Sequence, residues 1–462
     1  MGGRLVPMPL VSLAVVFGLL VFLYMRSRRN PLFLAGAAAF LVLGRSMFID
    51  ISASLGVPGL WPANMGDVLF AVVAVGWLYA RDRRPVPRVR LSVWWFVLGA
   101  FFALFIAMEL ALSVANASGL DSGTPFEARY WFYIPCGFLV SLDVLRRFTL
   151  VEVDEYIRVL SILTTCLAVL YIASALNVPV YPYEKNYTYV VGGTTIIRDF
   201  GTVPTWLILA WGYFLSRSQK NGWTFVALLV LACAEFLTYT RSSVVMFAVS
   251  GVLVAGLMVL RRGRRRRGAV LVASGAVVAV LALGLLPAVL PAQFEFFQSR
   301  IRGLVGLQSI LAAPNFAYRF TGFETARRAG ALADPYLGAG MFEASQVMNS
   351  ADSDIQRVVY RTGLVGVAVF AAPIVGALLV AIGRIGRRSL DISAESLLLT
   401  GVVVTLPFVF SFFGVGYLQW PPLSLFPVAL IAYATGFPAL AAAAPTRSLE
   451  SRAGSGEPAT GL

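Results

Sequence analysis

Apolar runs long enough to cross a lipid bilayer recur along this chain from Leu5 to Leu440. A transmembrane helix needs roughly 17 to 25 such residues, and about thirteen runs of that length can be marked out. Inside hydrocarbon every backbone N–H and C=O must be paired within the protein, and for continuous runs only the α-helix meets this demand. Hydrophobic residues make up 58% of the chain and charged residues 13%, a more apolar composition than that of soluble domains. We therefore predict an all-α, polytopic membrane protein with about 12–13 transmembrane helices.

The apolar runs form one transmembrane domain over residues 1–440. Within it, residues 291–357 mix Phe and Leu with Arg, a composition that suits amphipathic helices at a membrane surface. We expect this segment to form a long helical loop on the outer side of the membrane. Residues 441–462 are rich in Ser, Gly, Glu and Pro, which predicts a disordered cytoplasmic tail. The first apolar run lacks a basic leader and a small-residue cleavage site, so we interpret it as a retained helix.

Clusters of basic residues follow every second apolar run and set the expected orientation. They lie at 26–29, 81–90, 146–158, 217–220, 261–267, 384–388 and 447–452. Cytoplasmic loops of membrane proteins carry an excess of Lys and Arg, so we expect these clusters inside the cell and the N-terminus outside. Orientation then explains most of the net charge of +14. A nucleic-acid site would gather basic residues on one face, so we expect no nucleic-acid partner.

The chain contains no His, which removes several kinds of chemistry at once. Imidazole bases, His metal ligands and Ser-His-Asp triads are all excluded. Cys136, Cys166 and Cys233 lie singly in apolar runs, a pattern typical of neither a disulfide framework nor a metal site. We expect no metal and no cofactor. Any proton transfer must use a carboxylate, a tyrosine, a substrate group or water.

Two basic residues interrupt the apolar pattern in segments that we expect on the outer side. In IIRDFGTVPTW, Arg198 and Asp199 precede a helix entry with Gly and Pro, which leaves backbone N–H groups able to face an anion. An ordinary ion pair beside a turn explains this segment equally well. In LTYTRSSVV, Arg241 lies between two runs with almost no loop, where a guanidinium is costly unless it reaches the surface or binds an anion. Both alternatives stay open for Arg241.

The outer loop itself carries a third group of arginines, between Arg319 and Gly340. Arg319 and Arg327 are eight residues apart, about two helical turns, and so share one side of a helix. They are candidates for substrate binding. For the neighbouring Arg328 we prefer an exposed, solvated position.

The segment NSADSDIQRVVYRTGLVG leads into the next apolar run and forms the fourth group. In a helix, Arg357 and Arg361 are spaced i, i+4, and Asp354 lies one turn before Arg357. Such a face can bind a phosphate and supply a base. It can equally form a ladder of ion pairs worth only tenths of a kcal/mol each.

The four groups share one side of the membrane and one kind of side chain. Guanidinium groups are permanently charged, and their forked donors match the oxygens of phosphate. A pyrophosphate carried by a lipid is therefore the ligand that the residues favour, with the lipid tail remaining in the bilayer.

The order of these segments resembles that of the bacterial O-antigen ligase and oligosaccharide repeat-unit polymerase superfamily. The resemblance runs over residues 197–367 through RDFGTVP, LTYTRSSVV, YRFTGFETA with DPYLGAG, and DSDIQRVVYRTGLVG. In the family the last pattern typically begins with His or Asp and ends in Gly-Leu-x-Gly. Here Asp352 occupies its first position, and Gly363 and Gly366 close it. The order and spacing of the motifs carry the resemblance, and the N-terminal half adds only its topology.

The resemblance implies an inverting, metal-independent glycosyltransferase of the bacterial inner membrane with its active face outside the cytoplasm. Its donor would be a polyprenyl-pyrophosphate-linked glycan held within membrane lipid, its acceptor a sugar hydroxyl, and a chain-length regulator protein a possible partner. Arg198, Arg241 and Arg319 match the family's functional arginines, which bind the pyrophosphate and stabilise it as it leaves. Asp352, or Asp354 in its place, would act as base or orient the acceptor.

Departures from the family pattern select among its members. Ligases that act on lipid A core usually carry His where this chain has Asp352. The resemblance therefore favours a polymerase, or another member that assembles exopolysaccharide or cell-wall glycan, over an O-antigen-type ligase. Phe323 stands where the family usually has a Trp after the third arginine. Pro204 is followed by Thr205, whereas the family often has Asn after this Pro.

Two other classes of protein stay open. A transporter or flippase for a lipid-linked or anionic solute could use Glu109 and Glu235 for proton coupling, since ionisable groups inside apolar runs are usually functional. The chain shows no inverted repeat, which speaks against this class. A non-catalytic membrane scaffold is the last alternative.

Overall fold

A computed structural model describes most of the helical part of the chain. The described residues are 65–116, 124–175, 187–191, 194–198, 203–217, 222–238, 241–260, 290–301, 354–387, 391–411 and 425–437, with short stretches or single positions at 18–33, 269–288 and 324–340. Most of the expected outer loop after residue 301, and the tail at 441–462, lie outside them.

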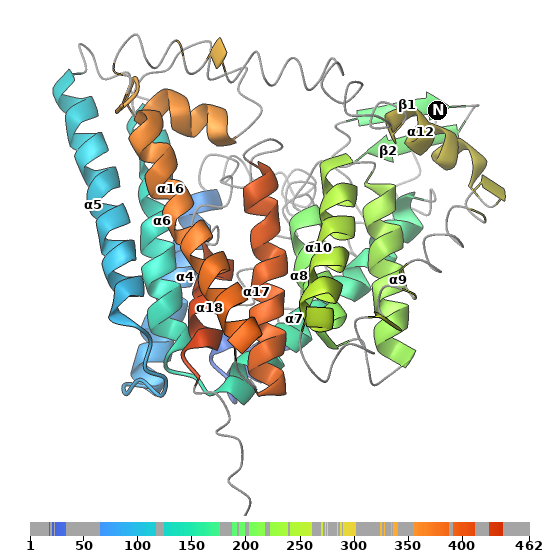
Figure 1. The fold of residues 1–462 in the computed structure, drawn as a ribbon, viewed down its shortest axis with the longest axis horizontal. Coiled ribbons are helices and arrows are strands. Elements are labelled where there is room, and N and C mark those ends of the chain that lie inside the picture. Colours follow the sequence, from blue (N-terminus) through green and yellow to red (C-terminus); the bar gives the residue numbers. More distant parts are fainter. Residues whose placement is uncertain are drawn as a thin grey trace, which may run out of the picture.

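The described elements are helices joined by one small hairpin (Figure 1). The helices are α4 (Met65–Arg83), α5 (Val93–Asn116), α6 (Thr124–Leu145), α7 (Leu150–Ala175), α8 (Val203–Arg217), α9 (Gly222–Leu237), α10 (Arg241–Leu260), α12 (Pro291–Ile301), α16 (Asp354–Arg387), α17 (Ile392–Ser411) and α18 (Phe426–Thr435). Three of them hold stretches long and apolar enough to cross a membrane, at Val93–Val114, Leu150–Ala173 and Gln356–Ile385. Shorter apolar helices accompany them, for example Gly222–Leu237 and Ile392–Leu406.

The strands β1 (Tyr187–Val191) and β2 (Thr194–Arg198) correct the expectation of an entirely helical chain. They pair antiparallel, with Tyr187 opposite Arg198 and Val191 opposite Thr194. Both strands consist mainly of β-branched and aromatic residues, which favour extended backbone. The sequence between them is Gly-Gly, a pair typical of two-residue hairpin loops.

The distribution of polar and apolar side chains on the helices suits a lipid environment. The outer face of α5 exposes large apolar side chains such as Trp94, Phe101 and Leu104. Hydroxyls lie inside, where those of Ser161 and Thr164 donate to the carbonyls of Ile157 and Leu160. A hydroxyl bonded to its own helix needs no water, so these side chains can remain inside a membrane.

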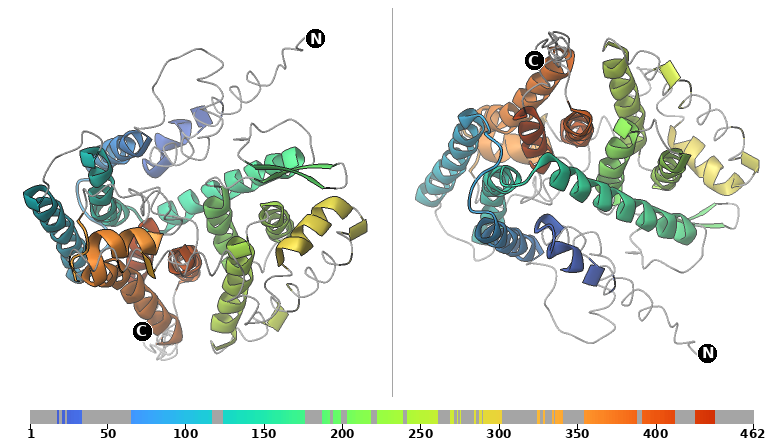
Figure 2. Two further views of the ribbon diagram at one scale, coloured as in Figure 1. Left: turned by 90° about the horizontal axis from the view of Figure 1, so that it is seen from above. Right: turned by 90° about the horizontal axis from the view of Figure 1, so that it is seen from below.

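The helices form two groups with α17 and α18 between them, as the views along the helices show (Figure 2). One group contains α5, α6 and α16, and edge-to-face contacts of Phe370 with Phe102 and Trp131 join these three helices. The other contains α7, α8, α9 and α10. Because α17 packs on α8 and α10 of the second group and on α16 of the first, it connects the two groups.

Basic residues gather at one end of the bundle, which we call the basic end; it comprises the described residues 24–33, 81–94, 143–155, 217, 384–387, 391–393 and 433–437. Long-range bonds join these segments. Arg217 donates to Asp154 and to the hydroxyl of Ser393, and Arg384 donates to the carbonyl of Phe437. The described members of the clusters at 26–29, 81–90, 146–147, 217 and 384 therefore share one end. The hairpin and α12 lie at the other, upper end in Figure 1.

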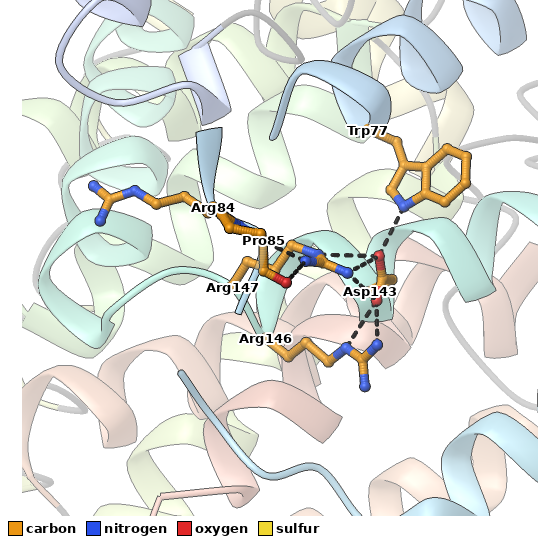
Figure 3. A network of polar contacts seen from close by, with 6 residues as sticks. All are labelled: Trp77, Arg84, Pro85, Asp143, Arg146 and Arg147. Atoms are coloured by element: carbon orange, nitrogen blue, oxygen red, sulfur yellow. Dashed lines mark hydrogen bonds and ion pairs between the residues drawn. The ribbon is translucent and has the colours of Figure 1, made fainter. Parts of the chain in front are cut away.

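Asp143 organises the basic end (Figure 3). Its carboxylate accepts bonds from the Trp77 indole at 2.8 Å, from Arg146 at 2.8 Å and from Arg147 at 3.0 Å. Arg147 also donates to the carbonyls of Arg84 and Pro85. One carboxylate thus fixes α4, α6 and the segment after α4 to one another.

A capping box continues this network at the start of α7. Glu152 accepts from the Thr149 backbone and hydroxyl, while the Thr149 hydroxyl accepts from the Glu152 N–H, a reciprocal arrangement that satisfies two free donors of a helix start. Glu152 also accepts from Arg84 at 2.6 Å.

Candidate functional site

Asp334 and residues 336–340, which we call the 334–340 turn, pack against the first turns of α16. The Asp334 carboxylate accepts from the N–H groups of Tyr336 and Leu337 at 2.7 and 2.8 Å, and the Asp334 carbonyl accepts from Gly338 at 2.8 Å. Asp starts turns because its short side chain can bond its own backbone two residues on. The sequence DPYLGAG therefore shapes this turn locally.

A kink in α16 creates the surface that receives the turn. Gly363 has φ 59° and ψ −158°, far from helical values, although helix continues on both sides. In an unbroken helix the carbonyls of Tyr360 and Arg361 would accept from the fourth residue onward. Here they accept instead from Ala339 at 2.8 Å and Gly340 at 3.0 Å. Val365 completes the junction by donating to the Tyr336 carbonyl at 3.1 Å.

Glycine is needed on both sides of this junction. Gly338 and Gly363 have positive φ, which glycine adopts readily and other residues rarely. A Cβ at Gly338 would lie 2.6 Å from the Tyr360 carbonyl oxygen, and one at Gly363 would overlap the Tyr336 carbonyl. The junction thus joins the GAG of DPYLGAG to the TGLVG of DSDIQRVVYRTGLVG, two motifs that are separate in the sequence.

Arg361 lies just before the kink and is 94% buried, with 6% of its surface exposed. Its guanidinium carbon is 5.8 Å from the ring centroid of Trp131 on α6, within cation–π range. Arg357, one turn earlier on α16, is half-buried. The helix does begin at Asp354, so the two arginines have the expected i, i+4 spacing.

Helix α5 brings a buried carboxylate to the same region. Glu109 is 1% exposed, and among the described residues its Oε1 has no hydrogen-bond partner. Ser113, one turn further along α5, donates to the Glu109 carbonyl at 2.7 Å. A Cβ at Gly340 would lie 2.8 Å from the Ser113 hydroxyl, so only glycine lets the 334–340 turn approach α5 this closely. Glu109 therefore lies beneath the turn, one helical turn from its point of contact.

This arrangement can bind and orient a polar ligand near the end of the bundle. A buried guanidinium next to an aromatic ring offers fixed donors to an anion. A buried carboxylate with an unused oxygen offers an acceptor to a hydroxyl. Because burying such a group costs free energy, its presence usually marks a functional site. We call the 334–340 turn, Glu109, Ser113, Trp131 and the first turns of α16 the candidate site.

The structure brings together only some of the residues expected from sequence. Arg357 and Arg361 belong to the candidate site. Asp354 begins α16, but its side chain lies outside the described part. Asp352, Arg319 and Arg327 lie wholly outside the described residues. Their roles stay predictions.

Two further arginines lie on elements away from the turn. Arg198 is the last residue of β2, and Arg241 is the first residue of α10. The hairpin lies beside α12, across the bundle from α5 and α16 in both figures, whereas α10 contacts α16. The side chains of both arginines lie outside the description. Helix α10, which begins with Arg241, is thus nearer to the candidate site than the hairpin that ends with Arg198.

Sequence reasoning missed the partners that other helices provide. Trp131 lies 230 residues before Arg361 and has no local feature that distinguishes it from the other aromatic residues of its run. Glu109 did carry a signal, because it is a charge inside an apolar run, but that signal pointed to proton coupling rather than to the 334–340 turn.

No protein-family model matches the chain, and no curated protein matches it significantly. The resemblance to the O-antigen ligase and repeat-unit polymerase superfamily stays a hypothesis that rests on the order and spacing of the motifs.

Proposed function

We propose that this protein polymerises glycan units carried on polyprenyl pyrophosphate at the outer face of the bacterial inner membrane, as a metal-independent, inverting glycosyltransferase with about 12–13 transmembrane helices. The junction between the 334–340 turn and α16 carries the proposal. Its main-chain bonds hold the buried Arg361 beside the turn, at the end of the bundle away from the basic end.

The position of the junction suits a lipid-linked pyrophosphate. Basic clusters mark the cytoplasmic side of membrane proteins, so the opposite end would face outward. A carrier whose tail lies in the bilayer would present its pyrophosphate at the helix ends, within reach of Arg357 and Arg361. Guanidinium groups held in place before the reaction stabilise negative charge that develops on a leaving group.

The proposed reaction is a single displacement. An acceptor sugar hydroxyl forms a bond to the anomeric carbon of the donor, and the bond from that carbon to the pyrophosphate oxygen breaks. The pyrophosphate leaves with the electron pair, held by Arg241 and Arg319 together with Arg361. The hydroxyl proton passes to a carboxylate, for which Asp352 or Asp354 is the candidate. Arg198 and Arg327 would add contacts to the donor.

Purified full-length protein in lipid nanodiscs tests the proposal when it receives a polyprenyl-pyrophosphate oligosaccharide and the products are separated by length. We expect a ladder of longer glycans from the wild type. Arg361→Gln should lower the rate on the order of 100-fold or more, and Arg361→Lys should restore only part of it because lysine lacks the forked donors.

Arg328→Gln is the matched control, because the Arg328 side chain is 73% exposed and its ion pair within the described residues is with the nearby Glu324. It should leave the ladder unchanged. Transfer of glycan to a different acceptor would replace the polymerase with a ligase. No transfer with several carriers would overturn the proposal.

The buried carboxylate of Glu109 keeps a transporter as the second candidate. Such a protein would move the lipid-linked substrate across the bilayer of a vesicle without lengthening its glycan, and Glu109→Gln would stop that movement.

A further inference from the structure

Eleven arginines of the basic end form two sets with different surroundings, apart from Arg384, which donates to the Phe437 carbonyl. In one set, Arg26, Arg84, Arg146, Arg147 and Arg217 each pair with an Asp or Glu. The second set is exposed, and none of its members forms an ion pair within the described part of the chain. It comprises Arg28, Arg29, Arg81, Arg83, Arg88 and Arg90. We call this second set the exposed arginines.

The exposed arginines belong to one surface because their two segments are bound to the same helix start. Asn30, directly after Arg28 and Arg29, donates to the Glu152 carbonyl at 2.9 Å. Arg84, inside the other segment, pairs with the Glu152 carboxylate. Residues 24–33 and 81–90 thus meet at the first turn of α7.

The backbone that carries Arg88 and Arg90 is held rigidly. The N–H groups of Arg88 and Val89 both donate to the Arg146 carbonyl, at 2.8 and 2.9 Å. Arg147 binds the carbonyls just before them (Figure 3). The paired arginines therefore fix the segment in place, and the exposed arginines project from it.

Apolar and aromatic side chains interleave with the exposed arginines. Val86, Val93 and Trp94 are all exposed, Trp94 by 73%. The guanidinium carbons of Arg81 and Arg83 lie 5.6 and 5.4 Å from the ring centroids of Trp77 and Tyr79. Arginine, tryptophan and valine together are typical of the interface between hydrocarbon and headgroups, where long side chains reach toward the phosphates. A soluble acidic partner would not require the apolar residues.

We propose that the exposed arginines form a binding surface for anionic phospholipid headgroups in the leaflet around the basic end. The proposal does not rest on the glycosyltransferase activity. Each basic residue near an anionic membrane surface contributes about fivefold in affinity at moderate salt, so four of them account for a preference on the order of 100-fold or more.

Native mass spectrometry of the full-length protein, titrated with phosphatidylglycerol or phosphatidylcholine, tests the proposal. The wild type should bind phosphatidylglycerol more tightly, and added salt should reduce the difference. A variant with Arg81, Arg83, Arg88 and Arg90 all changed to Gln should lose most of the preference while it binds phosphatidylcholine as before, which also shows that it is folded.

Arg328→Gln and Arg84→Gln are the controls. Arg328 is exposed but lies outside the basic end, so its loss should leave the preference intact. Arg84 is paired with Glu152, and its loss should lower the melting temperature with little change in lipid preference. Equal binding of the two lipids by the wild type would overturn the proposal. So would an unchanged preference in the four-site variant, and a soluble acidic partner would then be the better occupant.

Discussion

At the basic end, Arg146 and Arg147 share the carboxylate of Asp143, and Arg84 pairs with Glu152. At the candidate site, main-chain bonds to the carbonyls of Tyr360 and Arg361 hold the 334–340 turn on α16. The two regions therefore use different means to fix irregular backbone. One uses side-chain charge, and the other uses glycine and peptide groups.

The difference indicates how charge is divided between stability and function. Where ion pairs hold the chain, replacing a charged residue should mainly destabilise the fold. Where glycines and peptide groups hold it, a buried charged residue can be replaced with less damage to the fold and more to the function. Four substitutions separate these two roles of charge and backbone, and they differ in the size of their effect on stability.

Gly363→Ala should have the largest effect on stability. Alanine disfavours φ 59°, and its Cβ would overlap the Tyr336 carbonyl, so the turn must separate from α16. We expect a loss of about 3 kcal/mol or more in the free energy of unfolding, measured by denaturant titration in detergent, together with loss of activity. Gly376→Ala is the matched control in the same helix, since nothing lies within 4 Å of the added methyl group. Equal effects of the two substitutions would contradict the assignment of the junction.

Asp143→Asn should come next and should affect stability alone. It removes the charge that binds Arg146 and Arg147 and that accepts from the partly buried Trp77 indole. We expect a loss of about 2 kcal/mol, with activity per folded molecule unchanged. Asp82→Asn, at an exposed position of α4, should change little. A variant that folds normally but is inactive would show that the basic end takes part in function.

Glu109→Gln should act in the opposite direction on stability. A neutral amide avoids the cost of burying a carboxylate with an unused oxygen, so we expect a gain of about 1 kcal/mol in the same titration. Activity should fall, as expected where a functional group is kept at the expense of stability. Ser113→Ala serves as control for the neighbouring contact. Reduced stability in Glu109→Gln would mean that the carboxylate has a structural role.

Arg328→Gln should have the smallest effect. Its pair with Glu324 is an i, i+4 contact at the surface, so we expect a change of about 0.3 kcal/mol or less. A loss above about 1 kcal/mol would show that exposed charge stabilises the upper end as well. It would contradict the proposed difference between the basic end and the candidate site.

The helical segments could be predicted because their signals are local. Run length, apolar composition and the i, i+4 spacing of Arg357 and Arg361 are all visible within a few turns of chain. The hairpin was missed because two five-residue strands between apolar runs give too short a pattern to stand out from a loop. The expected helix count, the outer loop and the roles of Arg198, Arg241, Arg319 and Asp352 stay predictions.

The candidate site was predictable only in its parts. GAG and TGLVG could be marked as motifs, but nothing in either shows that the carbonyls of Tyr360 and Arg361 accept from the other segment. Trp131 and Glu109 come from helices far away in sequence. Pairing across such distances depends on how the helices pack.

Amino-acid composition and order are enough to predict that this chain forms apolar helices and where its basic residues concentrate, since both follow from the transfer of side chains between water and lipid, residue by residue. Which arginines are paired, which are exposed and which is buried beside the 334–340 turn depends on how the helices pack. Ion pairs and backbone hydrogen bonds act over a few ångströms, so their partners are chosen when distant segments come into contact.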